Sequence, residues 1–345
     1  MKSIKLFSFA KINLSIDVKG IGSEGFHEVD MIMQQLSFHD DVAVAYEPYG
    51  EPERAADGAP GAAPEAPGAD GKDCKETDLT TSGSFDIKVK TNRYYLPVDE
   101  RNLAYRAAAL IAERYGGAVR PGRIKIDIGK RIPVAGGLAG GSGNGAAVIH
   151  ALNILWELGL SLGEIMDLSG ELGSDVPFCA MGQAKCNAAV PEEVRQDAMA
   201  SSCARARGRG SDLTPLTPFR SWIVIAKPRF SVSTKEVYDG IDRVKIGERP
   251  DNDRLEQALS EGPSGANASG IYRDFVNVLE CYTLQAYPEV AELKEFMKKC
   301  GAVKALMSGS GPTVFGVFRD IKGAKSASAR LRKKGFEAYW TKTIR

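Results

Sequence analysis

Histidine and closely spaced cysteine are scarce in this sequence of 345 residues. It has three histidines, and none of its six cysteines forms a Cys-x-x-Cys pair. The cysteines are Cys74, Cys179, Cys186, Cys203, Cys281 and Cys300. A metal cluster needs closely spaced ligands, and a disulfide framework is typical of short, cysteine-dense chains. The composition therefore argues against both kinds of site and predicts free thiols in a reducing compartment.

The sequence also has little net charge and lacks long apolar runs. The formal net charge is +1, whereas a dedicated nucleic-acid binder would be expected to carry a basic stripe. No apolar run approaches the ~20 residues that span a bilayer, and the first 14 residues lack a signal-peptide core. We therefore expect a cytoplasmic protein with neither a nucleic acid nor a membrane as partner. With 43% hydrophobic and 26% charged residues, a chain of this length is expected to form two domains or one bilobal unit.

Glycine is abundant in one stretch, residues 133–147, which runs into an apolar segment at 148–158. Glycine is unfavourable inside helices, but it lets backbone N–H groups approach an anion without a Cβ in the way. We therefore expect a phosphate-binding loop that leads into a helix starting near Ala146, with the positive end of its dipole towards the loop. No Gly-Lys-Ser/Thr sequence closes the stretch, so it is not a Walker loop. The alternative is a flexible glycine linker, which a preceding strand at 123–128 makes a poorer explanation.

The N-terminal part of the chain has the alternation of β-strands. Residues 12–18 alternate apolar and polar side chains, and Lys11 and Asn13 would share one face. On alternation alone, Lys11 also fits a solvated lysine on a sheet. Glycines at 20, 22 and 25 spell Gly-x-Gly-x-x-Gly, but residues 28–36 return to a strand pattern, so we predict a hairpin turn and reject a dinucleotide site.

Two segments have the composition of irregular structure. Residues 47–84 are rich in Pro, Gly, Ala and acidic residues, and such a segment buries too little apolar surface to offset its ordering entropy. We predict a mobile insertion there, between strands at 36–46 and 85–89. A second irregular insertion is predicted at 184–210.

Helix signals follow at several points. Acidic residues at 99 and 100 predict the first turn of a helix that extends to residue 111. Ser161 and Glu164 form a capping box for a helix over 162–172. Asp175 precedes Val-Pro and reads as the N-cap of a further helix. Helices are also expected at 253–259 and 286–299, a buried strand at 222–226, and a strand, glycine turn and strand over 305–318.

Motifs at both ends of the chain and in its middle resemble those of the GHMP small-molecule kinases. The opening Ser8 to Leu14 is similar to the first motif of the 4-diphosphocytidyl-2-C-methyl-D-erythritol kinases within that family. The glycine stretch resembles the second GHMP motif, and residues 305–316 resemble the third, although a plain hairpin would also explain them. Gly-Ser-Asp-Val-Pro-Phe at 173–178 is similar to the family's catalytic aspartate motif, and 275–280 to its Asn-x-Leu-Glu element.

The resemblance implies an α+β, two-domain GHMP kinase fold. An N-terminal ribosomal-protein-S5-like lobe that binds ATP would cover residues 1–183, and a C-terminal ferredoxin-like α/β lobe would cover 184–345. Lys11 and Asp175 would be catalytic, with the lysine cation near the transferring group and the carboxylate accepting the alcohol proton.

The resemblance also implies binding residues. ATP would be bound by Asn102, Leu103, Pro133, Val134, Ala135, Gly136, Gly137, Leu138, Ala139, Gly140, Gly141, Ser142 and Gly143. The substrate would contact Asn13, Phe26, His27, Thr234 and Tyr238, with Phe26 and Tyr238 facing each other across a cytosine ring. A glycine turn of Ser308, Gly309, Ser310 and Gly311 would support the phosphates. Mg²⁺ would accompany ATP with Ser142 as a hydroxyl contact, although Gly143 stands where many relatives have a second Ser or Thr.

The implied activity is ATP-dependent phosphorylation of the 2-hydroxyl group of 4-diphosphocytidyl-2-C-methyl-D-erythritol, a step of non-mevalonate isoprenoid biosynthesis. The partner is thus a small-molecule substrate, bound by a monomer or a homodimer. Two alternatives remain: another GHMP kinase of the homoserine or mevalonate type, and a catalytically inactive GHMP-fold protein that senses nucleotide.

Overall fold

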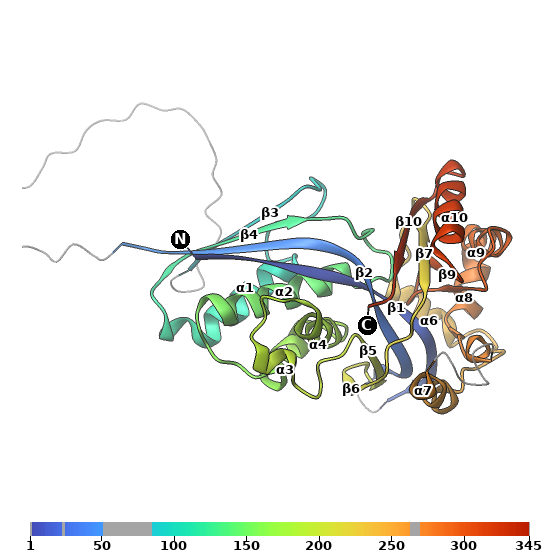
Figure 1. Cartoon of the computed structure of the whole chain (residues 1–345), viewed down its shortest axis with the longest axis horizontal. Coiled ribbons are helices and arrows are strands. Elements are labelled where there is room, and N and C mark those ends of the chain that lie inside the picture. The colour runs from blue at the N-terminus through green and yellow to red at the C-terminus, as the bar shows by residue number, and fades with distance from the viewer. Residues whose placement is uncertain (1, 23–24, 51–84, 263–269, 345) are drawn as a thin grey trace, which may run out of the picture.

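The computed structural model describes residues 2–22, 25–50, 85–262 and 270–344. Most of the predicted insertion at 47–84 therefore lies outside the described residues. Two units, each built on a β-sheet, lie side by side along the long axis of the molecule (Figure 1). The α+β organisation in two units that the resemblance implies is therefore observed.

The first unit contains a six-stranded sheet in the order β3-β4-β2-β5-β6, with β1 paired to β2. Its strands are β1 (Lys2–Ile21), β2 (His27–Pro48), β3 (Phe85–Thr91), β4 (Gly122–Gly129), β5 (Cys203–Gly208) and β6 (Asp212–Pro215). Alternate residues of β4 are buried, as its apolar pattern predicts. The hairpin predicted at glycines 20–25 joins β1 to β2.

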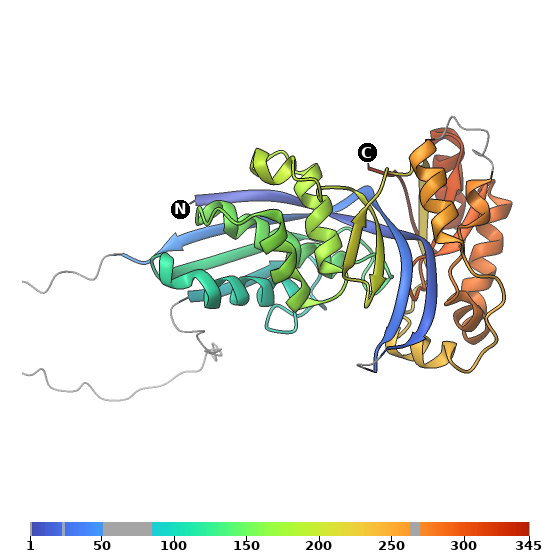
Figure 2. The ribbon, with the colours of Figure 1, turned by 90° about the horizontal axis from the view of Figure 1, so that it is seen from below.

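Helices cover one face of this sheet, as the view from below shows (Figure 2). They are α1 (Leu103–Tyr115), α2 (Gly140–Leu155), α3 (Leu162–Leu172), α4 (Val176–Cys186) and the short α5 (Glu192–Arg195), with a 3-10 turn η1 (Gly116–Ala118) after α1. The buried faces of β4 and α2 meet in one apolar core. The predicted capping box of Ser161 and Glu164 starts α3.

The second unit contains a four-stranded antiparallel sheet in the order β10-β7-β9-β8, the order of a ferredoxin-like lobe. Its strands are β7 (Trp222–Lys227), β8 (Lys304–Met307), β9 (Val314–Phe318) and β10 (Glu337–Lys342). Its helices are α6 (Thr234–Ile241), α7 (Asn252–Glu261), η2 (Ile271–Arg273), α8 (Glu280–Ala286), α9 (Pro288–Lys299) and α10 (Ile321–Lys333). Helices α9 and α10 pack on one face of the sheet, and the other face packs on β1 and β2.

The long strands β1 and β2 connect the two units. Register shifts interrupt their pairing between Phe9 and Lys11 and between Asn13 and Ser15. Such irregularities bend a strand and re-aim its side chains. Beyond them, Ile16 forms a bridge with Asn277 of the second unit.

The prediction for the start of α1 was wrong. The helix begins at Leu103, and Asn102 is its N-cap, with Oδ1 accepting a hydrogen bond from the Ala104 N–H. Asp99 lies before the helix, where its carboxylate pairs with the Arg101 side chain at 2.6 Å. The acidic residues at 99 and 100 are therefore outside the first turn.

The prediction for the start of α2 was also wrong, because the helix begins at Gly140 and takes in half of the glycine stretch. A Cβ at position 143 would lie 2.5 Å from Ser8 Oγ, and one at position 145 would lie 3.3 Å from the Leu103 carbonyl oxygen. The glycines therefore let the helix approach β1 and α1 closely. This packing outweighs the helix propensity of about 1 kcal/mol lost at each glycine.

The segment predicted as irregular at 184–210 contains α5 and β5, and β5 pairs with both β2 and β6. Arg205 of β5 holds the carboxylate of Asp30 on β2 with two hydrogen bonds of 2.8 Å. The first sheet thus extends to Pro215, and we propose that the boundary between the two units follows it.

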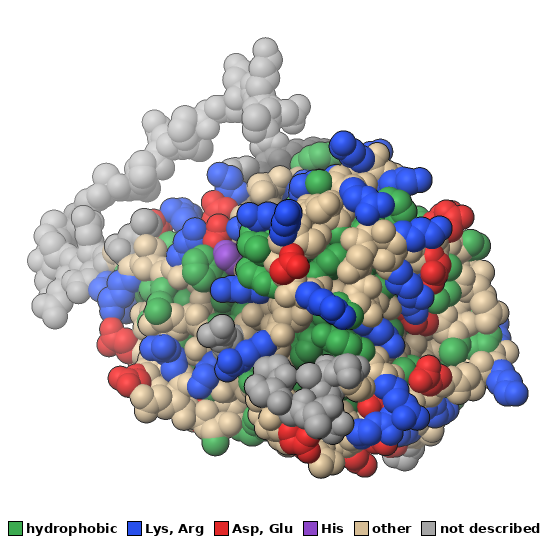
Figure 3. Space-filling view, turned by 45° about the vertical axis from the view of Figure 1, so that its right-hand side comes forward, with side chains coloured by type: hydrophobic (Ala, Val, Ile, Leu, Met, Phe, Trp, Pro, Cys, Tyr) green, Lys and Arg blue, Asp and Glu red, His purple; other side chains and the backbone are tan. Residues whose placement is uncertain are grey.

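The surface of the second unit mixes charges. Figure 3 shows basic side chains interspersed with acidic and apolar ones on this face. None of the described helices is both long and apolar enough to cross a membrane.

Candidate active site

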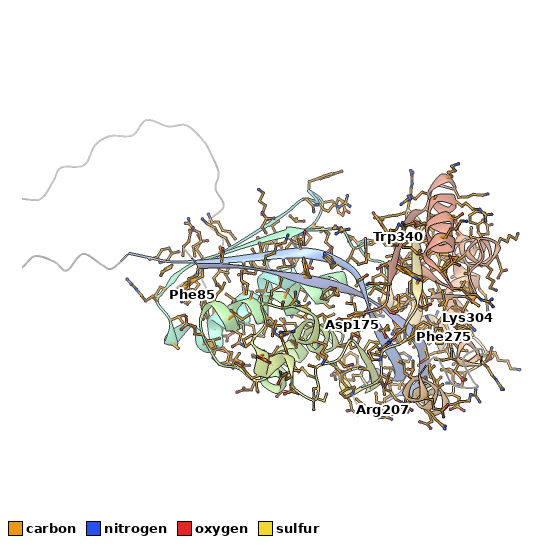
Figure 4. All side chains as sticks on the ribbon, in the orientation of Figure 1. Phe85, Asp175, Arg207, Phe275, Lys304 and Trp340 are labelled. Atoms are coloured by element: carbon orange, nitrogen blue, oxygen red, sulfur yellow. The ribbon has the colours of Figure 1, made fainter. Side chains whose placement is uncertain are left out.

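Asp175 lies where the two units join (Figure 4), and Lys11 on β1 forms an ion pair with it. The Lys11 Nζ atom lies 3.6 Å from Asp175 Oδ2 and donates a hydrogen bond of 2.8 Å to Asn13 Oδ1. The lysine side chain is only 5% exposed, whereas that of Asp175 is 33% exposed. A buried cation thus faces a carboxylate that solvent and ligands can reach.

Asp175 owes its position to the turn between α3 and α4. Its backbone provides the N-cap of α4, as predicted, but its side chain accepts no capping hydrogen bond. The carboxylate therefore remains available to the site. Gly173, with φ of 158°, ends α3 and separates the two helices.

Contacts from two distant segments fix the glycine loop before α2. Gly137 has φ of 72°, and a Cβ there would overlap the carbonyl oxygen of Ser308. Ser308 Oγ in turn donates a hydrogen bond of 2.9 Å to the Gly137 carbonyl oxygen. On the other side, the Lys11 N–H donates to the Leu138 carbonyl oxygen at 3.1 Å. The loop is thus held between the glycine turn of the second unit and the strand that carries Lys11.

The remaining residues predicted for ATP binding lie around this loop. The Asn102 side chain makes two hydrogen bonds. Its Oδ1 atom caps α1, and its Nδ2 atom donates to the Pro97 carbonyl oxygen at 2.8 Å. Leu103 packs against Gly141 and Gly145 in the first turns of α2. The N–H groups at the start of a helix have no partners within it and favour phosphate, so the cradle suits a nucleotide.

A cavity of about 800 Å³ joins the Lys11 and Asp175 pair to the predicted substrate residues. Its lining residues also include Asn13, Gly137, Thr234, Gly309, Ser310, Phe26, His27, Arg209, Tyr238 and Asp242. The side chains of Thr234 and Ser310 share a hydrogen bond of 3.0 Å. The volume lies within the usual range for small-molecule sites.

Aromatic side chains line one end of the cavity. The rings of His27 and Tyr238 lie 5.2 Å apart, and Phe26 is more than half exposed. Burial, and secondarily the Asp175 charge, raises the pKa of Tyr238 to about 12, so its phenol stays neutral. This end of the cavity can stack against a planar ring.

Sequence reasoning missed two residues here. Arg209 places its guanidinium 4.1 Å from the centre of the Phe26 ring, and Asp242 lies 3.0 Å from His27 Nε2. The signal available in the sequence was the pair of glycines on either side of Arg209, because glycines mark tight turns. In the structure both Gly208 and Gly210 have positive φ.

The described residues contain no group of three or more His, Cys, Asp or Glu side chains that could hold a metal ion. Ser142, the predicted Mg²⁺ contact, is half-buried in the first turn of α2. The protein side chains alone therefore do not preform a metal site in the described part of the chain.

Comparisons with known proteins agree with this geometry. Residues 102–183 match the GHMP kinases N terminal domain, and residues 251–337 match the GHMP kinases C terminal domain. A protein of Alkaliphilus metalliredigens named 4-diphosphocytidyl-2-C-methyl-D-erythritol kinase is 40% identical over 96% of this chain and 93% of its own length. A protein of the same name from Clostridioides difficile is 36% identical over 98% and 95% of the two chains.

Solved structures give the same result. A crystal structure of 4-(cytidine 5'-diphospho)-2C-methyl-D-erythritol kinase superposes with a TM-score of 0.68 at 26% identity and covers 99% of both chains. A homoserine kinase from Cytophaga hutchinsonii shares the fold, with a TM-score of 0.62 at 18% identity over 100% of this chain and 95% of its own. By its matches over the whole length, the chain belongs to the GHMP kinase family.

Proposed function

We propose that this chain transfers the γ-phosphoryl group of ATP to the 2-hydroxyl group of 4-diphosphocytidyl-2-C-methyl-D-erythritol. The observation that carries the proposal is the 3.6 Å approach of Lys11 Nζ to Asp175 Oδ2 in a cavity that also reaches Gly137 of the glycine loop. The names of relatives at 36–40% identity support the choice of acceptor.

The reaction needs positioning and charge stabilisation more than covalent help, because phosphoryl transfer passes through a loose transition state. The acceptor oxygen bonds to the γ-phosphorus as the bond from phosphorus to the ADP oxygen breaks. Asp175 takes the hydroxyl proton. Lys11, fixed by Asn13, stabilises the negative charge on the transferring group.

ATP would be held by the glycine loop and the first turn of α2, where a positive helix end and free N–H groups favour phosphate. Mg²⁺ neutralises phosphate charge in such reactions. We propose Ser142 Oγ as its protein contact, with the nucleotide phosphates supplying the other oxygen ligands.

The cytidine part of the substrate would occupy the aromatic end of the cavity. Phe26 and Tyr238 offer faces for stacking, and His27 offers a polar edge. Purified protein should therefore be stabilised against heat more by CDP than by UDP, because the two pyrimidines differ in the polar groups that a histidine edge can read. Equal stabilisation would count against the assignment of these residues.

Isosteric variants test the catalytic pair. Lys11→Met and Asp175→Asn should each lower kcat by about 100-fold or more while the unfolding transition stays close to that of the wild type. Lys5→Met is a matched control on the same strand, because the contact of Lys5 within the described part of the chain is an exposed ion pair with Asp41 at 3.3 Å and such pairs contribute little. Near-normal turnover in either catalytic variant would refute the mechanism.

The identity of the molecule that accepts the phosphoryl group distinguishes the proposed function from its two alternatives. With labelled ATP, transfer to homoserine or mevalonate in place of the cytidyl substrate would indicate another GHMP kinase. Failure to transfer label to any acceptor, with nucleotide still bound, would indicate an inactive sensor.

A further inference from the structure

Asp40, on β2, is fully buried beneath the glycine loop and does not line the cavity. Its Oδ1 atom accepts hydrogen bonds of 2.7 Å from the backbone N–H groups of both Arg131 and Ile132. Its Oδ2 atom accepts a hydrogen bond from the ammonium group of Lys130. One carboxylate thus fixes three consecutive residues that lead into the loop.

The same carboxylate also contacts the other end of the loop. Asn144, in α2, is 4% exposed. With its amide nitrogen facing the acceptors, Asn144 donates to Asp40 Oδ2 at 3.0 Å, to Ser8 Oγ at 2.9 Å and to the Gly140 carbonyl oxygen at 3.0 Å. Asp40 therefore joins the segment before the loop to the helix after it.

Lys130 also contacts Asp40 beneath the glycine loop, and it is itself held in place. Its backbone is held by Asn92, whose side chain accepts from the Lys130 N–H at 2.8 Å and donates to the Lys130 carbonyl oxygen at 3.3 Å. Its ammonium group lies against the first residue of α2, since a Cβ at Gly140 would be 2.6 Å from Nζ. Burial lowers the pKa of Lys130, and the Asp40 charge opposes that shift.

We propose that Asp40 is a positioning residue for the nucleotide. It fixes residues 131–132 and 144 relative to each other, so that the N–H groups of the loop between them are preorganised to bind phosphate. Preorganised donors lose little freedom on binding and therefore bind an anion more tightly than mobile ones. This inference rests on the proposed use of ATP.

Asp40→Asn tests the role with little change in shape. The asparagine oxygen can still accept from Arg131 and Ile132, but its amide nitrogen then faces two other donors, Lys130 Nζ and the Asn144 amide. Affinities for ADP and CDP would be measured by calorimetry at a temperature where circular dichroism shows the variant folded. We expect the Kd for ADP to rise about tenfold, equivalent to about 1.4 kcal/mol, with the Kd for CDP unchanged.

Asn144→Ala provides a second variant if Asp40→Asn does not fold. It leaves the contacts of Asp40 with residues 130–132 in place and removes those of Asn144 with Asp40, Ser8 and Gly140 at the helix end. We expect a smaller rise in the Kd for ADP, again without a change for CDP. Asp274→Asn is the control, because it breaks another buried carboxylate's pairing, with Arg254 in the second unit. It should lower stability and leave both affinities unchanged.

The outcomes separate two failures. If wild-type protein binds ADP but Asp40→Asn and Asn144→Ala bind it equally well, or weaken ADP and CDP alike, Asp40 has only a structural role and the inference is wrong. If the wild type binds neither ATP nor ADP, the proposed function itself is wrong.

Discussion

Acidification should lower the free energy of unfolding of this protein through the buried side chain of His150. It lies on α2, which begins at the glycine loop, and its Nε2 donates a hydrogen bond of 2.9 Å to the Ala180 carbonyl oxygen on α4, which begins after Asp175. Burial lowers the pKa of His150 from 6.5 to about 4. The neutral ring therefore helps to hold together the two helices that frame the site.

The direction of the effect follows from the two pKa values. In the unfolded chain His150 binds a proton below pH 6.5, whereas in the folded protein it stays neutral until about pH 4. The unfolded state thus binds more protons in this window, and stability falls as the pH falls through it. At about 1.36 kcal/mol per pKa unit, the cost between pH 7 and pH 5 is roughly 2 kcal/mol of the free energy of unfolding.

Urea unfolding at pH 7 and pH 5 would measure this cost, with His150→Gln as the reference. Glutamine can donate to the same carbonyl oxygen and does not titrate, so the difference between the two proteins removes the contributions of all other groups. We expect the wild type to lose roughly 2 kcal/mol more than the variant. Equal losses in the two proteins would show that His150 is not kept neutral by burial.

Three further substitutions test the structure. Gly137→Ala should raise the KM for ATP without affecting CDP binding, because alanine at positive φ costs roughly 1 kcal/mol and its Cβ would overlap Ser308; an unchanged KM would contradict the loop geometry. Arg205→Met should lower the free energy of unfolding by about 3 kcal/mol, because it leaves the Asp30 carboxylate without the Arg205 guanidinium. Urea titration would measure this loss. A loss below about 1 kcal/mol would indicate that solvent screens the pair. Phe26→Ala should weaken CDP binding about tenfold, the effect of losing one stacked base, with no loss of stability because the ring is more than half exposed; calorimetry showing full affinity would exclude stacking.

Local patterns predicted the elements whose neighbours in sequence determine them. The capping box at Ser161 needs only a glutamate three residues later, and the strand at 123–128 shows its own alternation. The Asp175 motif was predicted for the same reason, since a residue before Val-Pro begins a helix whatever packs against it. The cavity could be predicted only from the resemblance to known kinases.

Elements determined by distant contacts were predicted poorly. Nothing local in the glycine stretch indicates a helix from Gly140, because the stabilising contacts come from Ser8 and Leu103. Strand β5 was missed because Arg205 and Arg207 suggest a solvated segment, although Asp30, 175 residues earlier, neutralises the first of them. A single sequence gives no signal that such a pair is in contact.

The strand that carries Lys11, the glycine loop and the turn at 308–311 come together because β1 bends. The alternation of apolar and polar residues in the sequence does not reveal this bend. Because β1 bends at its register shifts, Ile16 reaches Asn277. Asn277 Nδ2 donates to the carbonyl oxygens of Met307 and Gly309, at 2.9 and 2.8 Å, and so shapes the turn whose Ser308 holds Gly137. The strand that carries Lys11 thus also anchors the turn that fixes the glycine loop. The position of Lys11 relative to the glycine loop is therefore set within one connected set of backbone and side-chain contacts, and either sheet moving alone would disturb it.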